Sequence, residues 1–209
     1  MMSYFPRARE AGEFMLNLGC GWDAAAKPAC QRAGFSHVGV DIASPAADLL
    51  CDAHALPFRD QSFGFVLSIA VLEHIQHPLV AARETCRVLK PGAKFIGTVA
   101  FLEPYHSRSY YHHSHLGVIN TLETAGFLVE QVSMSKTWDV LAAQSAMQLF
   151  PRMPHALSAA LVWPLRILHR LWWTLGRLVT RHPEVSELNR LLYGSGAFFF
   201  VATKRQERL

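Results

Sequence analysis

Short apolar runs recur along the chain, and several of them end in a glycine or an acidic residue. The runs cover residues 13–21, 37–41, 47–52, 64–70, 93–101, 127–134 and 197–204. Their length and flanking turn residues predict buried strands. Segments with helical character lie between them, at residues 28–33, 78–89 and 116–125. Strands that alternate with helices predict an α/β fold with a parallel sheet covered on both faces.

The predicted helices carry their own start and stop signals. Pro78 suits the first position of a helix that runs to about Leu89, because its missing N–H has no helical partner there. Lys90-Pro91-Gly92 is predicted to end that helix. Gly34 and Gly126 are predicted to end the other two.

Candidate ligand-binding residues fall at the carboxyl ends of the predicted strands, where open α/β sheets bind their ligands. Gly19-Cys20-Gly21 forms a turn in which the backbone can approach a ligand. Asp41 ends the next strand and can accept both hydroxyls of a ribose, while Asp52 ends the third and can accept from the adenine amine. Asp23 opposes a pyrophosphate and Ala24 breaks the glycine pattern of dinucleotide folds. A nucleoside without phosphates is therefore favoured over NAD.

Composition and charge narrow the function classes. The chain has 209 residues, of which 51% are hydrophobic and 17% charged, so it can bury a sizeable core. The net charge of +4 is too small to predict a nucleic-acid partner. Residues 1–150 carry 11 basic and 13 acidic side chains, whereas residues 151–209 carry 9 and 3. The basic excess therefore lies in the C-terminal part.

Cysteine spacing and the N-terminus indicate the compartment. The four cysteines form no C-x-x-C pair, which favours neither a zinc site nor a redox motif. The first ten residues carry charges where a signal peptide has its apolar core. No stretch of about 18 apolar residues is free of charge, so no transmembrane span is expected. We expect a cytoplasmic location with reduced thiols.

Four motifs in order resemble the class I S-adenosylmethionine-dependent methyltransferases, and most closely their small single-domain type 11 group. They are LNLGCG at 16–21, DAHALPF at 52–58, SFGFVLSIAVLEHI at 62–75 and RVLKPG at 87–92. The resemblance covers residues 13–134 and 197–204. It implies one methyltransferase domain over residues 1–209 with a Rossmann-like, doubly wound, seven-stranded sheet. That sheet would be mostly parallel with an antiparallel last strand, and a helical lid or insertion would occupy about 137–193.

The resemblance also implies S-adenosylmethionine as cofactor and assigns residues to its methionine end. The backbones of Gly19, Cys20 and Gly21 would approach the methionine portion and the ribose. Asn17 stands where the family commonly has an acid, so it would meet the methionine ammonium through a neutral oxygen. Ser68 and Ile69 would line the cofactor after the fourth strand.

The adenosine end would be held from the next two strand ends. By the same resemblance, Asp41 would hold the ribose hydroxyls and Ile42 would pack on adenine. Asp52 and Ala53 would read the adenine edge. On the alternative reading, Asp41 and Asp52 only cap their strands.

The segment that follows the fifth strand, residues 101–118, is predicted to overhang the cofactor. It contains four of the chain's 11 histidines. A base helps methyl transfer to a hydroxyl, and histidine titrates near neutrality. We expect His106 first and His113 second in that role, against the alternative of a polar surface loop. The spacing of HHSH matches no recognised ligand pattern, so no metal is predicted, and Glu73-His74 is read as structural at the start of a helix.

Residues 156–181 form an amphipathic helical pattern. Arg166, Arg170, Arg177 and Arg181 share one stripe. The opposite arc is apolar and comprises Leu161, Leu168, Leu171, Trp172, Leu175, Leu178 and Val179. Pro164 marks a kink or a new start. Two readings follow: an interfacial helix on an anionic membrane, favoured by Trp163, Trp172 and Trp173, or a lid whose apolar arc packs on the sheet.

The leading hypothesis is a methyltransferase that acts on a small-molecule, lipid-linked or glycan-linked acceptor, at oxygen, without a nucleic-acid partner. The alternative is a non-catalytic methyltransferase-like subunit that docks a partner or a membrane through its C-terminal amphipathic helices. In either case, peripheral contact with the inner face of the membrane is an open option.

Overall fold

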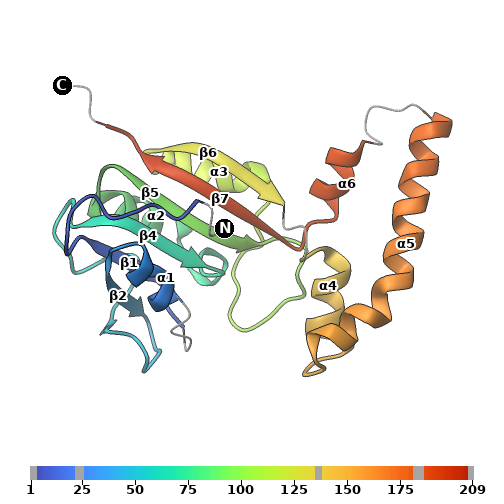
Figure 1. Cartoon of the computed structure of the whole chain (residues 1–209), viewed down its shortest axis with the longest axis horizontal. Helices are drawn as coiled ribbons and strands as arrows, with labels where there is room; N and C mark the ends of the chain where they lie inside the picture. The colour runs from blue at the N-terminus through green and yellow to red at the C-terminus, as the bar shows by residue number, and fades with distance from the viewer. Residues whose placement is uncertain (1–3, 22–25, 135–137, 181–185, 207–209) are drawn as a thin grey trace.

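A seven-stranded mixed sheet forms the centre of the molecule (Figure 1). The computed structural model describes residues 4–21, 26–134, 138–180 and 186–206. The strand order is β3-β2-β1-β4-β5-β7-β6. The strands are β1 (Phe14–Leu18), β2 (Ser36–Asp41), β3 (Leu49–Leu50), β4 (Phe63–Ile69), β5 (Leu89–Ala100), β6 (Phe127–Met134) and β7 (Ala197–Lys204).

The strand directions confirm the predicted topology. β1 to β5 pair in parallel, and β7 pairs antiparallel with both β5 and β6. The fold is therefore the Rossmann-like α/β fold that the sequence predicts, with a mostly parallel sheet and an antiparallel last strand. The carboxyl ends of β1, β2 and β4 consequently lie along one edge of the sheet.

Helices cover both faces of this sheet. α1 (Ala26–Arg32) lies on one face, and α2 (Pro78–Val88) and α3 (His115–Thr124) lie on the other. The remaining helices are α4 (Val140–Gln144), α5 (His155–Thr180) and α6 (Glu187–Tyr193), with a 3-10 turn η2 (Leu72–His74) and a π-helical turn η3 (Ser145–Leu149). Side chains alternate across β1, so Leu16 joins the core under α2 and α3 while Met15 joins the core under α1. This alternation explains why the strand reads as a continuous apolar run.

Several element boundaries differ from the prediction. β3 has two residues, whereas the apolar run covers 47–52. α2 ends at Val88, and Lys90-Pro91-Gly92, predicted to separate helix from strand, belongs to β5. The pairing of β4 with β5 shifts register between Phe63 and Phe65. An irregularity of this kind accommodates a proline near the start of a strand, because the missing N–H is not needed for the ladder there.

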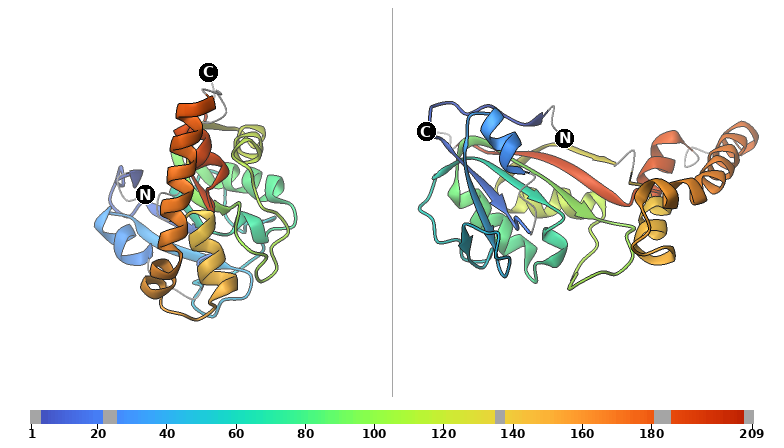
Figure 2. Two further views of the ribbon diagram at one scale, coloured as in Figure 1. Left: turned by 90° about the vertical axis from the view of Figure 1, so that its right-hand side faces the viewer. Right: turned by 60° about the horizontal axis from the view of Figure 1, so that its bottom comes forward.

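The C-terminal insertion forms a helical group at one end of the sheet. Figures 1 and 2 show α4, α5 and α6 gathered there, with α5 outermost. The group is tied back to the sheet by a bridge between Asp139 and Ser195 and by the hydrogen bond from Gly196 N–H to the Trp138 carbonyl, 2.9 Å long. Among the described residues, no helix combines the length and apolarity needed to cross a membrane.

The apolar arc of α5 faces away from the protein. All seven arc residues named from the sequence are exposed, Trp172 at 71% and Leu178 at 74%. The opposite side packs inward: Arg166 pairs with Asp139 at 2.9 Å, and Trp173 contacts Tyr193 of α6. The lid reading, in which the apolar arc packs on the sheet and the arginines face water, is therefore wrong for the apolar arc. Of the arginines, Arg166 is partly buried, whereas Arg170 and Arg177 are exposed. Arg181 lies outside the described residues.

Candidate functional site

The glycine turn after β1 is shaped by a close neighbour. Gly19 has φ +66°, and a Cβ at that position would lie 2.4 Å from Cγ2 of Val71. Gly21 has φ +61° with open space around it. Cys20 N–H donates to the Val40 carbonyl at 2.9 Å, which fixes the turn against β2. The turn therefore needs glycine at Gly19 for two reasons, conformation and contact.

The carboxylate of Asp41 organises the end of β2. Its Oδ2 accepts from Gly21 N–H at 3.0 Å, and its Oδ1 accepts from the N–H groups of Ala43 and Ser44 at 2.9 and 3.0 Å. Burial favours the neutral form of Asp41, but these hydrogen bonds outweigh it and lower its pKa. Asp41 is therefore an anion next to the glycine turn, as a ribose-binding carboxylate has to be. Ile42, which follows it, is 75% exposed and free to pack on a flat ring.

Asp52 is held at the end of β3 by a histidine. Its Oδ1 accepts from the backbone N–H of His54 at 2.9 Å and contacts the His54 Nδ1 at 2.6 Å. Both bonds lower the pKa of Asp52, and the bond from the backbone N–H contributes more. The other ring nitrogen of His54 accepts from His77 N–H at 3.1 Å, just ahead of α2. Asp52 is exposed and Ala53, beside it, is partly buried.

The remaining predicted cofactor residues lie at the ends of β1 and β4. Asn17 is buried, and its Nδ2 lies 3.4 Å from Nε2 of His37. Ser68 is fully buried, and its hydroxyl has no hydrogen-bond partner among the described atoms. Ile69 is exposed, and the next residue, Ala70, has φ +53°. The roles of these residues toward a cofactor stay predictions, as do those of Asp41 and Asp52. Asp23 and Ala24 lie outside the described residues.

His106 lies at a junction of the loop after β5. Its Nδ1 is 3.0 Å from the Pro104 carbonyl and 3.8 Å from Oε2 of Glu103. Glu103 in turn accepts a hydrogen bond from the Trp138 indole at 2.7 Å. The His74 ring meets the His106 ring edge-on, with centroids 5.1 Å apart. This contact brings the predicted loop next to η2, which the sequence does not indicate.

Glu73 is the buried acid of this region. It is fully buried, and its Oε1 accepts from Ala100 N–H at 3.2 Å. Burial raises the pKa of Glu73 to about 7. Glu73 and His74 lie in the 3-10 turn η2, which precedes α2. The VLEHI motif is the sequence signal for this pair, although the motif alone favours a structural role.

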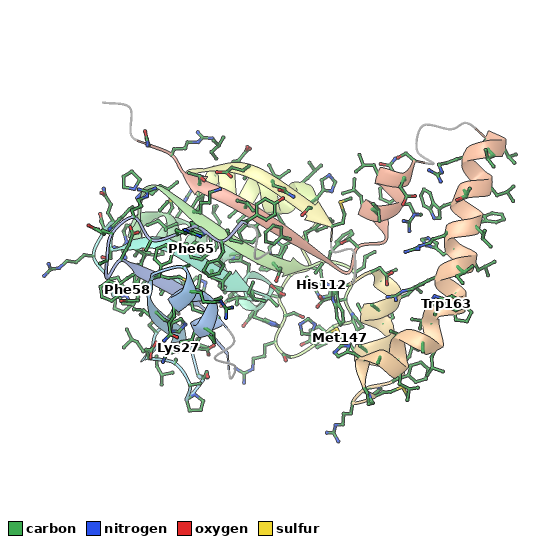
Figure 3. The ribbon with its side chains drawn as sticks, in the orientation of Figure 1. Lys27, Phe58, Phe65, His112, Met147 and Trp163 are labelled. Atoms are coloured by element: carbon green, nitrogen blue, oxygen red, sulfur yellow. The ribbon has the colours of Figure 1, made fainter. Side chains whose placement is uncertain are left out.

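His113 and His112 occupy different environments in the same loop. His113 is buried, and its backbone N–H donates to the Ala100 carbonyl at 2.8 Å. Burial lowers the pKa of its ring. His112 is exposed, and Figure 3 shows it in the loop between the sheet and α4. A base role for His113 stays a prediction. His106 lies beside Glu103 and His74, whereas the His113 ring lies beside Tyr111, with centroids 6.0 Å apart.

Comparisons with known proteins identify a related family over part of the chain. Residues 16–97 match a family model described as a methyltransferase domain. The Bos taurus protein named "Probable tRNA methyltransferase 9B" is 30% identical over 104 residues, which are 44% of this chain and 22% of that protein. The chain thus spans about a fifth of the length of that curated relative.

Solved structures share the fold. Haemonchus contortus phosphoethanolamine N-methyltransferase 2, solved with S-adenosyl-L-methionine, aligns with a TM-score of 0.60 at 20% identity, over 95% of this chain and 50% of that one. A Mesorhizobium loti S-adenosylmethionine-dependent methyltransferase aligns with a TM-score of 0.58 at 16% identity, over 97% and 94%. At these identities the likeness concerns the fold alone.

Proposed function

We propose, from the premise that this chain carries a class I S-adenosylmethionine-dependent methyltransferase domain, that it transfers a methyl group to a hydroxyl of a small-molecule, lipid-linked or glycan-linked acceptor. One observation carries the proposal. The ionised carboxylate of Asp41 lies within hydrogen-bond distance of the Gly21 N–H, at the edge of the sheet where ligands of such folds bind.

The residues present suit the cofactor. S-adenosylmethionine supplies a methyl group on a positively charged sulfur. Asp41 would hold the ribose, Ile42 would pack on adenine, and Asp52 would accept from the exocyclic amine. Asn17 would face the methionine end through a neutral amide. The main task of the protein is then to align donor and acceptor and to exclude water.

The transfer itself needs a base only at the acceptor. The acceptor oxygen attacks the methyl carbon in line with the carbon–sulfur bond, which breaks and leaves its electron pair on sulfur. The acceptor proton passes to a nearby base, and His106 is the proposed group because it is an imidazole in the loop beside η2. The products are a methyl ether, S-adenosylhomocysteine and one proton.

The outward apolar face of α5 favours a lipid-linked acceptor among the three classes. Trp163 and Trp172 are 61% and 71% exposed on this helix, and Figure 3 shows Trp163 at its surface. Tryptophan and leucine on one side of a helix with arginine on the other are typical of helices that lie in the membrane interface. The excess of six positive charges over residues 151–209 suits an anionic surface. We therefore propose a cytoplasmic protein that works at the inner face of the membrane.

Two measurements test this function. Calorimetric titration with S-adenosylmethionine should show binding that Asp41→Ala removes, and an absence of heat in the wild type would favour the non-catalytic alternative. Incubation with a labelled methyl donor and a total lipid extract should place label in the organic phase. Label in water-soluble metabolites would instead indicate a small-molecule or glycan-linked acceptor.

A nucleic-acid acceptor is the second candidate, because the curated relatives are named as tRNA methyltransferases. The same labelling reaction with bulk tRNA separates the two. Label in tRNA and none in lipid would replace the lipid proposal, whereas label in lipid alone would retain it.

A further inference from the structure

We propose that Glu73, His74 and His106 form a binding site for one divalent transition-metal ion, beside the place where the methyl acceptor sits. Each of the three side chains offers one ligand atom, and these atoms lie within 4.8 Å of one another. Two imidazoles and one carboxylate are a ligand set used for Zn²⁺ and for Fe²⁺ in sites that keep open positions. The role beside the acceptor rests on the proposed function, but the binding of the ion does not.

The buried carboxylate supplies the first argument. Glu73 is fully buried, and while its Oε1 accepts from Ala100 N–H, its Oε2 has no hydrogen-bond partner among the described atoms. An unpaired carboxylate oxygen away from water is costly unless a cation or a donor meets it. A metal ion between Glu73 and the two histidines supplies that cation.

His106 is oriented as metal-binding histidines commonly are. Nδ1 of His106 lies 3.0 Å from the Pro104 carbonyl oxygen. In metal sites the non-ligating nitrogen commonly donates to a carbonyl or carboxylate, which fixes the tautomer and leaves the other nitrogen as the ligand. The His106 ring has this outer partner already, and the His74 ring lies beside it with the two ring centroids 5.1 Å apart.

The two segments that carry the ligands are clasped together. The N–H groups of Tyr110 and Tyr111 donate to the Glu73 carbonyl at 2.7 and 3.2 Å. The Tyr111 hydroxyl donates to the Gln76 carbonyl at 3.1 Å. These bonds hold the loop after β5 against η2, so the three ligand groups are positioned by backbone contacts and not by the ion alone.

The neighbouring acid adds charge of the right sign. Glu103 has Oε2 3.8 Å from His106 Nδ1, and its Oε1 accepts from the Trp138 indole. The site follows β4 directly: Val71, which contacts the glycine turn at Gly19, lies just before η2. An ion there would polarise an acceptor hydroxyl and lower the free energy of its deprotonation. With the ion bound, His106 would act as its ligand and not as the base, and the acceptor proton would pass to water.

The test measures Zn²⁺ binding without any methyl transfer. Wild-type protein freed of metal with a chelator is titrated with Zn²⁺ by calorimetry, and Co²⁺ absorption in the visible range reports the coordination. We expect one ion per chain. His74→Ala and His106→Ala should each weaken binding ~10-fold or more. Glu73→Gln should do the same, with circular dichroism to establish that it folds.

His112→Ala is the matched control, because this exposed ring lies 6.4 Å from His106 but outside the proposed ligand set. It should bind Zn²⁺ as the wild type does. The proposal fails if the wild type takes up no equivalent of ion, or if His74→Ala and His106→Ala both keep wild-type affinity. It also fails if Asp52→Asn abolishes binding while His106→Ala does not. Titration with S-adenosylmethionine on the same samples tests the proposed function separately.

Discussion

The backbone N–H of Gly21 donates a hydrogen bond to Oδ2 of Asp41 at 3.0 Å, which joins the turn after β1 to the end of β2. The same carboxylate receives two N–H groups from the loop that follows it. One side chain therefore fixes the backbone on both sides of the proposed ribose position. A ligand there would meet an anion whose orientation is already set.

Asp41→Asn tests this arrangement at constant size. An amide that keeps its oxygen on Ala43 and Ser44 must turn its NH₂ group toward the Gly21 N–H, where two donors face each other. We expect affinity for S-adenosylmethionine to fall ~10-fold or more, since hydrogen bonds to charged groups contribute about 1.5–3 kcal/mol. Calorimetric titration measures it. Affinity equal to that of the wild type would mean that Asp41 does not bind the ribose.

Gly19 and Gly21 form a matched pair for a stability measurement. Both have positive φ, but only a Cβ at Gly19 collides, at 2.4 Å from Val71. Gly21→Ala should cost about 1–2 kcal/mol of unfolding free energy for its conformation alone, and Gly19→Ala clearly more. Urea unfolding of the two variants decides the comparison. Equal losses would mean that the Val71 contact is relieved at no cost.

The parts predicted from sequence are those that local pattern and spacing determine. The glycine turn and Asp41 lie together because the carboxyl ends of adjacent parallel strands share one edge of a sheet. The contact between His74 and His106 was missed because backbone hydrogen bonds from Tyr110 and Tyr111 place the loop, and no periodicity reveals them. For α5, the pattern correctly divides apolar from basic residues, but a helical wheel does not say which side meets the protein.

Glu84 explains why two of the sequence motifs occur together. Its Oε2 accepts from Leu56 N–H at 2.9 Å and pairs with Arg87 at 2.7 Å, while Arg87 donates to the carbonyls of Leu56 and Phe58. The hydrogen bond from Arg87, opposed by burial, lowers the pKa of Glu84. The motifs at 52–58 and 87–92 thus meet through a structural ion pair that holds the segment after Asp52.

This pair predicts a pH dependence of stability. Because the folded-state pKa of Glu84 lies below its unfolded value of 4.5, its contribution is present above that value and is lost as pH falls through the folded pKa. Glu84→Gln should lose about 1–3 kcal/mol of unfolding free energy at pH 7 and progressively less below pH ~4. Urea unfolding across this range measures the difference between variant and wild type. A difference that is constant with pH would contradict the charge-based explanation.

The exposed arc of α5 predicts binding to vesicles that contain anionic lipid. Trp172→Ser and Leu178→Ser each remove a large exposed apolar side chain, and burial of such a side chain contributes about 1.5–3 kcal/mol. We expect each to weaken flotation with anionic vesicles ~10-fold. Leu128→Ser, at an exposed leucine of β6, is the control and should bind as the wild type does. Undiminished flotation of both α5 variants would mean that any membrane contact lies elsewhere in the protein.

His106→Ala should separate chemistry from cofactor binding. His106 lies in the loop after β5 beside His74 and Glu103, and neither neighbour belongs to the proposed adenosine site. Its loss should lower turnover of the acceptor identified by labelling ~100-fold or more, the usual effect of a missing general base, while affinity for S-adenosylmethionine stays unchanged. His112→Ala, from the same loop, should keep turnover. If His106→Ala retains normal turnover, the ring is neither base nor metal ligand for this reaction. If turnover falls while Zn²⁺ binding is intact, the base role stands without the metal, because a ring that held the ion could not be removed without weakening it.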